Sequence, residues 1–274
     1  MMVRKMDKMQ FTCPVCGGEL TAGDGAWRCC RGHSFDVARQ GYVNLLTTPR
    51  RHSAAPGDTR EQVAARRAFL DGGFYAPIAQ ALERTARLYG AAGPMLDVGC
   101  GEGYYTAALA RSLGTRPVGM DVSREAVRAA SGRHKDGVWL CATASHIPVA
   151  DGSVGTLSSL FALTLPEEFH RVLRPDGLYL QVLAAQDHLL GLKGLIYPRI
   201  FRREKNSRPD YPGFERIASV PIRFSFTVSG PQVQNLLYMT PHVYRIGPEG
   251  AERLRQTQCL TDTASCVLNV FRAV

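Results

Sequence analysis

Short apolar segments alternate with helical segments between Pro94 and Ala184. The strand-like segments are "PMLDVGC", "RPVGMDVS", "GVWLCA", "VGTLSSLFA" and "GLYLQVLA", and the helical ones are "YYTAALARSLG", "REAVRAASGRH" and "PEEFHRVLRPDG". Such alternation forms βαβ units and a parallel sheet. Near the end of the chain, "IRFSFTV" and "ASCVLNVFRAV" have no clear crossover between them, which predicts an antiparallel pair at the edge. The pattern therefore predicts an α/β fold with a mostly parallel sheet.

The segment "LDVGCGEGYY" joins the first of these strands to its helix. Gly99, Gly101 and Gly103 let the backbone turn sharply and approach a ligand at the helix N-terminus, and Asp97 ends the strand. Asp121 ends the second strand, where a carboxylate can accept hydrogen bonds from both ribose hydroxyls of an adenosine. The loop and the acidic residue together predict a nucleoside-containing cofactor.

A nicotinamide dinucleotide and S-adenosylmethionine compete for this loop. Glu102 lies inside it, and its carboxylate would repel a pyrophosphate but suits the cationic amino-acid end of S-adenosylmethionine. We therefore predict S-adenosylmethionine as the cofactor. The residues predicted to bind it from the pattern are Asp97, Gly99, Gly101, Glu102, Gly103 and Asp121.

Five potential metal ligands lie near the N-terminus. Cys13 and Cys16 form a C-x2-C pair, and Cys29, Cys30 and His33 follow. Four soft or borderline ligands at such spacing suit one tetrahedral zinc ion, and a closed four-ligand site is structural because no position remains for water. The spacing allows either Cys29 or Cys30 as the third ligand. The alternative is a set of buried free thiols with a surface histidine.

Composition limits the partners and the compartment. The chain has 274 residues and a net charge of +9, which favours a polyanionic partner and leaves RNA, DNA and membrane surfaces open. No apolar run approaches the length of a membrane span, and "MMVRKMDKMQ" lacks the apolar core of a signal peptide. We expect a cytoplasmic protein with no membrane partner, whose cysteines are reduced.

We predict a zinc-binding lobe over residues 1–47, to which the family resemblance given below adds RNA recognition, a basic linker with an interlobe helix over 48–76, and a methyltransferase domain over 77–274. In the interlobe helix, Thr59 and Gln62 have capping-box spacing. Its arginines, expected on an exposed face that is either solvated or in contact with nucleic acid, are Arg60, Arg66 and Arg67. The next helix, "YAPIAQALERTARLYG", is expected to bury one face that carries Ile78, Leu82 and Leu88.

Several longer segments carry a family resemblance: "HSFDVARQGYVNLL", "PGDTREQVAARRAFLDGGFYAPI", "LDVGCGEGYYT", "HLLGLKGLIY" and "LLYMTPHVYR". With the N-terminal cysteines, they make the chain resemble the bacterial 23S rRNA (guanine-N1)-methyltransferases of the RlmA family over nearly its whole length. The resemblance implies a Rossmann-like class I methyltransferase domain with a small N-terminal zinc-binding lobe. It implies Cys13, Cys16, Cys29 and His33 as zinc ligands, and it implies donor binding at Tyr75, Gly101, Glu102 and His188.

The resemblance further implies methyl transfer from S-adenosylmethionine to N1 of a guanine in a 23S ribosomal RNA hairpin near the peptide exit tunnel. Two branches of the family modify neighbouring guanines, and the sequence does not choose between them; it also leaves a homodimer open. The chain departs from the family at Leu163, where a proline is usual, and at Asp176, where the usual turn is Pro-Gly-Gly.

The catalytic residue is unknown at this stage. Guanine N1 carries a proton that some group must accept; His188 is one candidate, although a binding or structural role is favoured for it. We expect Tyr75 to close the pocket, His146 to pack near the adenine, and Cys141, Cys100, Cys259 and Cys266 to be buried apolar residues. Two other functions remain open: a methyltransferase of small molecules or proteins with the zinc lobe as a lid, and a noncatalytic ribosome-binding factor.

Overall fold

The computed structural model describes residues 9–23, 25–47, 56–200 and 205–274. The N-terminal residues Arg4, Lys5 and Lys8, and Arg50, Arg51 and His52 of the predicted basic linker, lie outside these ranges. The strands are β1 (Leu20–Ala22), β2 (Ala26–Cys29), β3 (Ser34–Asp36), β4 (Tyr42–Asn44), β5 (Met95–Val98), β6 (Val118–Asp121), β7 (Val138–Cys141), β8 (Val154–Leu160), β9 (Leu173–Ala184), β10 (Phe214–Ser229) and β11 (Cys259–Ala273).

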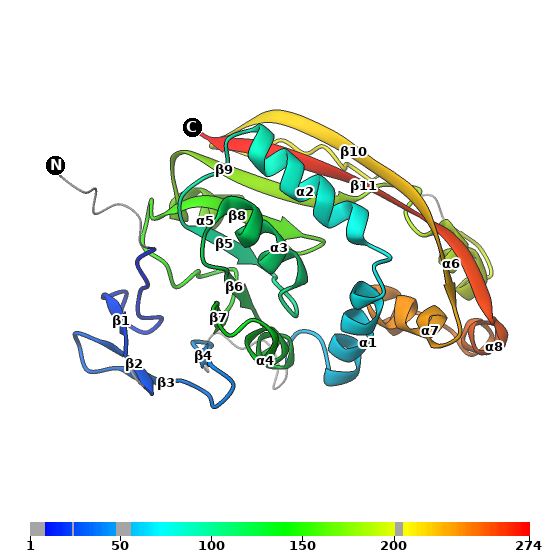
Figure 1. The fold of residues 1–274 in the computed structure, drawn as a ribbon, viewed down its shortest axis with the longest axis horizontal. Helices are drawn as coiled ribbons and strands as arrows, with labels where there is room; N and C mark the ends of the chain where they lie inside the picture. The colour runs from blue at the N-terminus through cyan, green and yellow to red at the C-terminus, as the bar shows by residue number, and fades with distance from the viewer. Residues whose placement is uncertain (1–8, 24, 48–55, 201–204) are drawn as a thin grey trace.

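An eight-stranded sheet in the order β10-β11-β9-β8-β5-β6-β7-β4 forms the centre of the molecule (Figure 1). The strands from β4 to β9 pair in parallel, whereas β11 is antiparallel to both β9 and β10. The predicted α/β fold and its antiparallel last pair are confirmed. The carboxyl ends of the parallel strands meet at one edge, where ligands bind in open α/β sheets.

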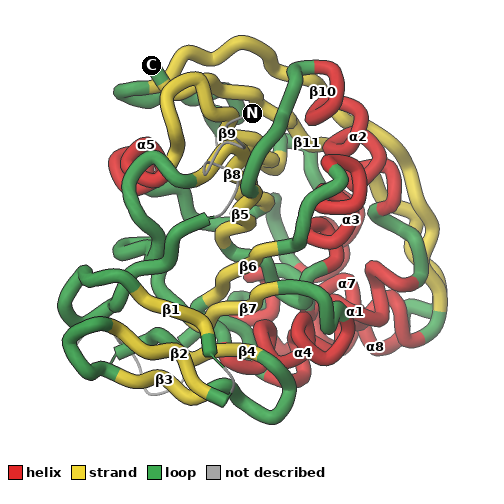
Figure 2. The backbone as a smooth tube through the Cα atoms, turned by 60° about the vertical axis from the view of Figure 1, so that its left-hand side comes forward, coloured by secondary structure: helices red, strands yellow, loops and turns green. Residues whose placement is uncertain are grey.

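The helices are α1 (Arg60–Asp71), α2 (Ala76–Leu88), α3 (Tyr104–Leu113), α4 (Arg124–Arg133), α5 (Pro166–Val172), α6 (Leu190–Ile196), α7 (Pro231–Tyr238), α8 (Pro248–Gln256) and the 3-10 helix η2 (Pro241–Tyr244). Figure 2 shows α1 to α4 along one face of the sheet and α5 on the other. In the part of the chain that the structure describes, no helix is long and apolar enough to span a membrane.

The N-terminal ribbon, which consists of β1, β2 and β3, packs on the face of the sheet that carries α5 (Figure 2). The N–H of Thr12 donates to the carbonyl of Pro148 at 3.0 Å, and the N–H of Ala150 donates to Gln10 at 2.8 Å. One buried cluster joins ribbon and sheet, and its members include Cys13, Leu20, Trp27, Val43, Leu96, Val98, Ile147 and Val149. The strand β4 leaves the ribbon and extends the large sheet beside β7.

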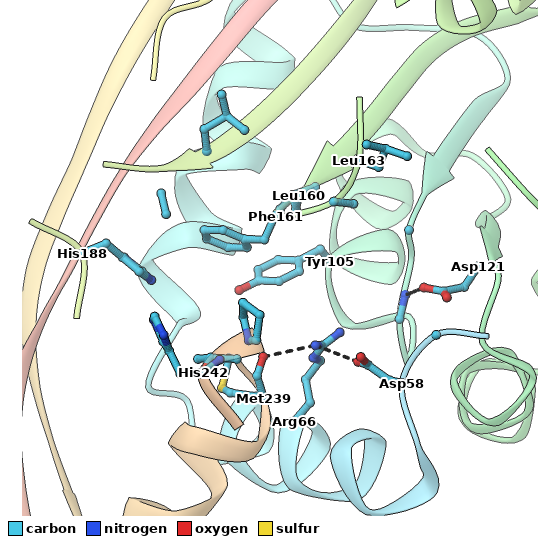
Figure 3. Close-up of a pocket in the computed structure, with 18 of the residues that line it drawn as sticks. Asp58, Arg66, Tyr105, Asp121, Leu160, Phe161, Leu163, His188, Met239 and His242 are labelled. Carbon is cyan, nitrogen blue, oxygen red and sulfur yellow. Dashed lines mark hydrogen bonds and ion pairs between the residues drawn. The ribbon is translucent and has the colours of Figure 1, made fainter. Parts of the chain in front are cut away.

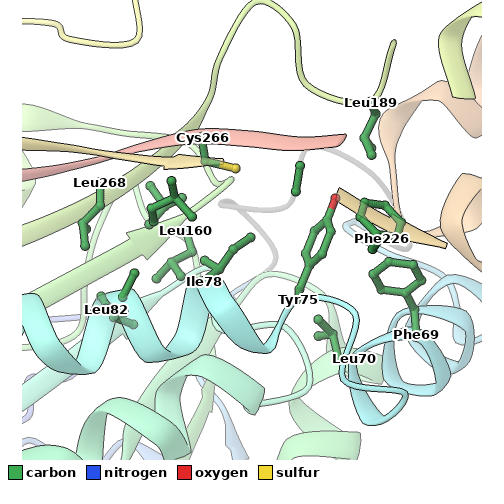
Figure 4. Packing of buried hydrophobic residues seen from close by; sticks show 14 of the residues in the cluster. Phe69, Leu70, Tyr75, Ile78, Leu82, Leu160, Leu189, Phe226, Cys266 and Leu268 are labelled. Atoms are coloured by element: carbon green, nitrogen blue, oxygen red, sulfur yellow. The ribbon is translucent and has the colours of Figure 1, made fainter. Parts of the chain in front are cut away.

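The capping box of α1 is confirmed: the N–H of Gln62 donates to Thr59 Oγ1 at 3.3 Å, and Gln62 Oε1 accepts the N–H of Thr59 at 2.9 Å. In α2, Ile78 and Leu82 are fully buried as predicted. The prediction for Leu88 is wrong, since this side chain is 76% exposed at the last residue of α2, where the helix has passed the core. Figure 4 shows Ile78 and Leu82 of α2 in the buried cluster with Tyr75.

Candidate functional site

A cavity of about 1390 Å³ opens at the carboxyl ends of the parallel strands. The loops that follow β5, β6, β7, β8 and β9 contribute to its walls, together with α1, α6, η2 and the segment 197–200 (Figure 3). All of the predicted donor-binding residues except Gly103 line it: Tyr75, Asp97, Gly99, Gly101, Glu102, Asp121 and His188. Gly103 caps α3 directly behind the loop.

The glycine loop needs its glycines for conformation and for space. Gly99 has φ 78°, and a Cβ there would lie 2.5 Å from Cβ of Ala162 in the wall after β8. Gly103 has φ 85°, and a Cβ there would lie 2.7 Å from the ring of Trp139 in β7. Positive φ and these contacts both exclude side chains, which brings the backbone of the loop against its neighbours and leaves the cavity open.

Asp97 supports the loop from below. It is buried, and its two carboxylate oxygens accept hydrogen bonds from Thr106 Oγ1 at 2.5 Å and from Ser158 Oγ at 2.7 Å. Burial raises the pKa of Asp97 to about 6 although both hydroxyls lower it. These bonds fix β5 to α3 and β8, so the clearest role of Asp97 in the structure is to hold the floor of the cavity.

Asp121 ends β6 at the cavity wall, as predicted. Its Oδ2 accepts the N–H of Gly101 at 3.0 Å, and its Oδ1 accepts the N–H of Ser123 at 2.8 Å. Burial raises the pKa of Asp121, and the two backbone hydrogen bonds oppose that shift. A carboxylate has about four lone-pair positions, so both oxygens can still accept ribose hydroxyls.

Glu102 has a cationic partner of its own. Its Oε2 pairs with Arg133 Nη1 at 2.8 Å, and Arg133 also reaches Asp71 at 2.5 Å. Burial raises the pKa of Glu102, and the charge of Arg133 opposes the shift. Its other oxygen, Oε1, is buried without a hydrogen-bond partner among the described residues. The pair ties the glycine loop to α4 and to the end of α1.

Tyr75 and His188 face each other across the cavity wall. Tyr75 Oη lies 3.4 Å from His188 Nε2, and the N–H of Ser265 donates to His188 Nδ1 at 3.2 Å. Burial, with the charges of Lys193 and Lys205, lowers the pKa of His188 to about 4. The ring is therefore neutral at neutral pH, with its Nδ1 lone pair engaged and its proton on Nε2.

Tyr75 is a fixed part of the wall. It is 2% exposed and packs edge-on against Phe69 and Phe226, with ring centroids 5.0 and 5.7 Å away (Figure 4). We expected a residue that closes the pocket as the lobes approach. Its burial in this aromatic cluster holds it in place instead, because moving the ring would open a large cavity in the core.

The cavity continues beyond His188 into a basic and aromatic region. Phe161 is 42% exposed with φ 54°, and Leu163 is 68% exposed, so an apolar surface stands where the family has its proline. Lys193, Lys205 and Arg245 line the same region and pair with no acid within the described ranges. In η2, burial and these three cations lower the pKa of His242 to about 4.

Other expectations for single residues are corrected or explained. His146 is exposed, whereas Ala142 to Ser145 line the cavity, so the preceding residues of that loop occupy the expected place. Cys259 is exposed at the start of β11; Cys100, Cys141 and Cys266 are buried as predicted. Asp176 has φ 60°, which is the left-handed region that favours the glycine usual at this turn.

Four of the five candidate metal ligands converge. The ligand atoms of Cys13, Cys16, Cys29 and His33 lie within 4.8 Å of one another, whereas Cys30 is exposed. Cys13 Sγ and Cys29 Sγ lie 3.6 and 3.3 Å from His33 Nδ1, and Cys16 Sγ lies 3.8 Å from Cys29 Sγ. A tetrahedron with zinc–sulfur bonds of about 2.3 Å has edges of about 3.8 Å, so the group fits zinc.

Sequence reasoning missed several residues of the cavity, among them Arg66, Lys193 and His242. Arg66 was assigned to the exposed face of α1, but it turns inward, pairs with Asp58 at 2.8 Å and lines the cavity (Figure 3). Lys193 and His242 were not singled out. Both lie in segments that carry the family resemblance, "HLLGLKGLIY" and "LLYMTPHVYR", and that resemblance was the available signal.

Two family models match the chain. A model described as RlmA, N-terminal, the zinc ribbon, matches residues 11–54 and contains the four converging ligands. A second, described as a methyltransferase domain, matches residues 96–180, from β5 into β9. The chain thus combines a zinc ribbon that can hold one structural zinc with an S-adenosylmethionine-dependent methyltransferase domain.

Curated relatives cover nearly the whole chain. A 23S rRNA (guanine(748)-N(1))-methyltransferase of Streptomyces fradiae is 34% identical over 264 residues, which cover 92% of this chain and 91% of that protein. YxjB of Bacillus subtilis, provisionally named for the same guanine-N(1) methylation of 23S rRNA, is 31% identical and covers 88% of this chain and 89% of its own. With the zinc ribbon, the donor cavity and this coverage, the chain belongs to the RlmA-type family of 23S rRNA (guanine-N1)-methyltransferases.

Proposed function

We propose that this chain transfers the methyl group of S-adenosylmethionine to N1 of a guanine in a 23S ribosomal RNA hairpin near the peptide exit tunnel. The observation that carries the proposal is the division of one cavity into two chemically different ends. The end at the glycine loop carries Asp58, Asp97, Glu102 and Asp121, and the other end carries Lys193, Lys205, His242 and Arg245. The first suits a donor with a sulfonium and an ammonium group, and the second suits an anionic nucleic acid.

The basic end fits an extruded nucleotide. Sequence-specific RNA recognition usually targets unstacked bases, which stack on aromatic side chains while phosphates meet cations. Phe161 offers an exposed ring at the junction between the two ends, and its centroid lies 5.9 Å from that of His188. Lys193 and Lys205 line this end, and their charges suit a backbone phosphate. A small neutral acceptor would have no use for these cations.

For the donor, we propose contacts with Tyr75, Asp97, Gly99, Gly101, Glu102, Gly103, Asp121 and His188. Bound S-adenosylmethionine supplies an electrophilic methyl carbon. The protein holds the acceptor nitrogen in line with it, and positioning of this kind can supply about 7–11 kcal/mol of the acceleration. Neutral His188 keeps its lone pair on Ser265, so we assign it to binding and not to removal of the N1 proton.

We propose the domain division at residues 1–47, 48–76 and 77–274, with zinc bound by Cys13, Cys16, Cys29 and His33. The ribbon lies beside the end of the sheet at β7 and β4 (Figure 2). A homodimer stays a hypothesis that sedimentation of the purified chain tests, and cytoplasmic location stays an expectation.

Primer extension on ribosomal RNA from cells with and without the gene tests the proposal. A stop at one guanine that disappears on deletion and returns with the wild-type gene is expected. Return of the stop with a donor-site variant such as Asp121→Ala would favour the noncatalytic alternative. If the chain methylates small molecules or proteins and leaves ribosomal RNA unmodified, the alternative of a small-molecule or protein methyltransferase is favoured.

A further inference from the structure

Arg66 reaches from α1 into the cavity beside the glycine loop (Figure 3). Its Nη2 pairs with Asp58 Oδ2 at 2.8 Å and donates to the carbonyl of Met239 at 3.2 Å. A Cβ built on Gly101 would lie 3.4 Å from its Nη1. The guanidinium therefore stands directly against the loop, and two partners on the same nitrogen fix its plane.

The charges at this end of the cavity are unbalanced. The acids that line it are Asp58, Asp97, Glu102 and Asp121, whereas Arg66 is the cation that the described residues place among them. The other cations of the cavity stand at the end with His188 and His242. Lys193 donates a hydrogen bond to the carbonyl of His188. Burial is the largest cause of the lowered pKa of both histidines, and the charges of Lys193 and Lys205 add to it. Among the described residues that line the cavity, Arg66 is thus the one cation at the donor end.

S-adenosylmethionine carries one anionic group, its α-carboxylate, among cationic and hydroxyl groups. The acids can serve the ammonium, the sulfonium and the ribose, but the carboxylate needs a cation. We infer that Arg66 binds this carboxylate through Nη1, which makes no hydrogen bond within the described residues and stands against Gly101. A hydrogen bond from a guanidinium N–H to a carboxylate is charge-assisted and therefore stronger than one between neutral groups. The inference rests on the proposed donor site and is independent of the RNA.

Asp58 and Met239 orient the guanidinium before the donor arrives, so little side-chain entropy is lost on binding. The arginine does more than position a neighbour, because it lines the cavity and its Nη1 stands against the glycine loop. It also distinguishes the donor from decarboxylated S-adenosylmethionine, which keeps the ammonium and the sulfonium and lacks only the carboxylate. Arg66 is thereby a specificity determinant for an amino-acid-bearing donor.

Calorimetry with the full-length, zinc-loaded chain and these two ligands tests the assignment. The wild type should bind S-adenosylmethionine about tenfold to a hundredfold more tightly than the decarboxylated ligand, which corresponds to charge-assisted hydrogen bonds. Arg66→Met should lose this preference by weakening S-adenosylmethionine alone, and Arg66→Lys should keep part of it. Absence of a preference in the wild type overturns the inference, as does an Arg66→Met variant that weakens both ligands equally.

Arg67→Met is the matched control, because Arg67 is the next residue of α1, is exposed and pairs with Asp71 at 3.6 Å. It should bind both ligands like the wild type. Asp58→Asn removes the ion pair but leaves the arginine, and it should keep the preference for the carboxylate. A preference lost in Asp58→Asn would place the determinant in the ion pair and overturn the assignment to Arg66. Failure to methylate ribosomal RNA would leave all these binding results unaffected.

Discussion

The N–H of Gly101 donates to Oδ2 of Asp121 at 3.0 Å, which joins the glycine loop after β5 to the end of β6. The second oxygen of Asp121 holds the N–H of Ser123, which caps α4. One carboxylate therefore fixes the two turns between which the adenosine is proposed to bind. Because Asp121 is partly buried, bulk water competes only weakly for these bonds.

Replacing Asp121 with Ala should weaken S-adenosylmethionine binding by about 2–4 kcal/mol, since the ribose would lose two charge-assisted hydrogen bonds. Asp121→Asn should lose less, because its amide oxygen can keep one backbone N–H in place. Calorimetry on both variants measures which of them loses more affinity for S-adenosylmethionine. Equal affinity of the wild type and Asp121→Ala would remove Asp121 from the donor site.

The strands from β5 onward and the glycine loop were predictable because they depend on local signals, namely apolar runs and glycine at a turn. Cysteine spacing predicted a zinc site but left Cys29 and Cys30 open, and the family resemblance chose Cys29. The inward position of Arg66 was not predictable, because it depends on Asp58 and on Met239, which is 173 residues away along the chain. The same holds for β4, whose partner β7 lies far along the sequence. Helical periodicity gives the face of a residue but not which distant element will stand against that face.

Acid should destabilise the protein through His188. Its pKa falls from 6.5 to about 4 on folding because of burial and nearby lysines, so the unfolded chain binds the proton first as the pH drops. As the pH falls from about 6.5 to about 4, the free energy of unfolding should therefore decrease. Above about pH 6.5 the stability that depends on neutral His188 should be fully present. Urea unfolding of the wild type and His188→Asn at several pH values measures the difference, in which the variant should show the shallower decline.

The asparagine amide oxygen can accept the N–H of Ser265 in place of Nδ1 and does not titrate. His242 titrates in the same range but is present in both proteins, so the difference between them isolates His188. An NMR titration of the His188 ring gives an independent check. A ring that protonates near pH 6.5 in the folded protein would contradict the prediction.

Removing the cation at Lys205 should weaken binding of the ribosomal hairpin and flatten its salt dependence. Each phosphate contact to single-stranded RNA contributes about 0.7 to the slope of log K against log salt, so Lys205→Ala should lower the slope by about that amount. Filter binding between low and moderate salt measures it. Affinity for S-adenosylmethionine should not change, because Lys205 lies at the other end of the cavity.

Arg128→Ala serves as the control for charge alone. Arg128 pairs with Glu125 on the outside of α4 at 3.9 Å and does not line the cavity. Its replacement changes the net charge by the same unit as Lys205→Ala. If both variants flatten the salt dependence equally, the effect belongs to overall charge and the phosphate contact at the basic end is not supported.

Cys16→Ser should release zinc, whereas Cys30→Ser should retain it, because the Cys16 thiol converges with the other ligands and Cys30 is exposed. Structural zinc contributes on the order of 10 kcal/mol of apparent binding free energy, comparable to the whole stability of a domain, so the ribbon should unfold without it. Metal analysis of the purified variants tests the ligand set. If Cys16→Ser keeps its full zinc content and Cys30→Ser loses it, then Cys30 and not Cys16 is the zinc ligand.

The structure also predicts how far the damage from zinc loss reaches. The ribbon shares a buried cluster with the sheet, and the N–H of Leu45 after β4 donates to Cys141 in β7 at 2.9 Å. Zinc loss should therefore increase hydrogen exchange at Leu45 and lower the melting temperature of the whole chain, while amides of β5 and β8 in the sheet centre stay protected. Donor binding should persist, because Asp121 is held by Gly101 and Ser123 and not by the ribbon. Exchange at Leu45 that is unchanged in zinc-free protein would show that β4 belongs to the methyltransferase domain independently of the metal.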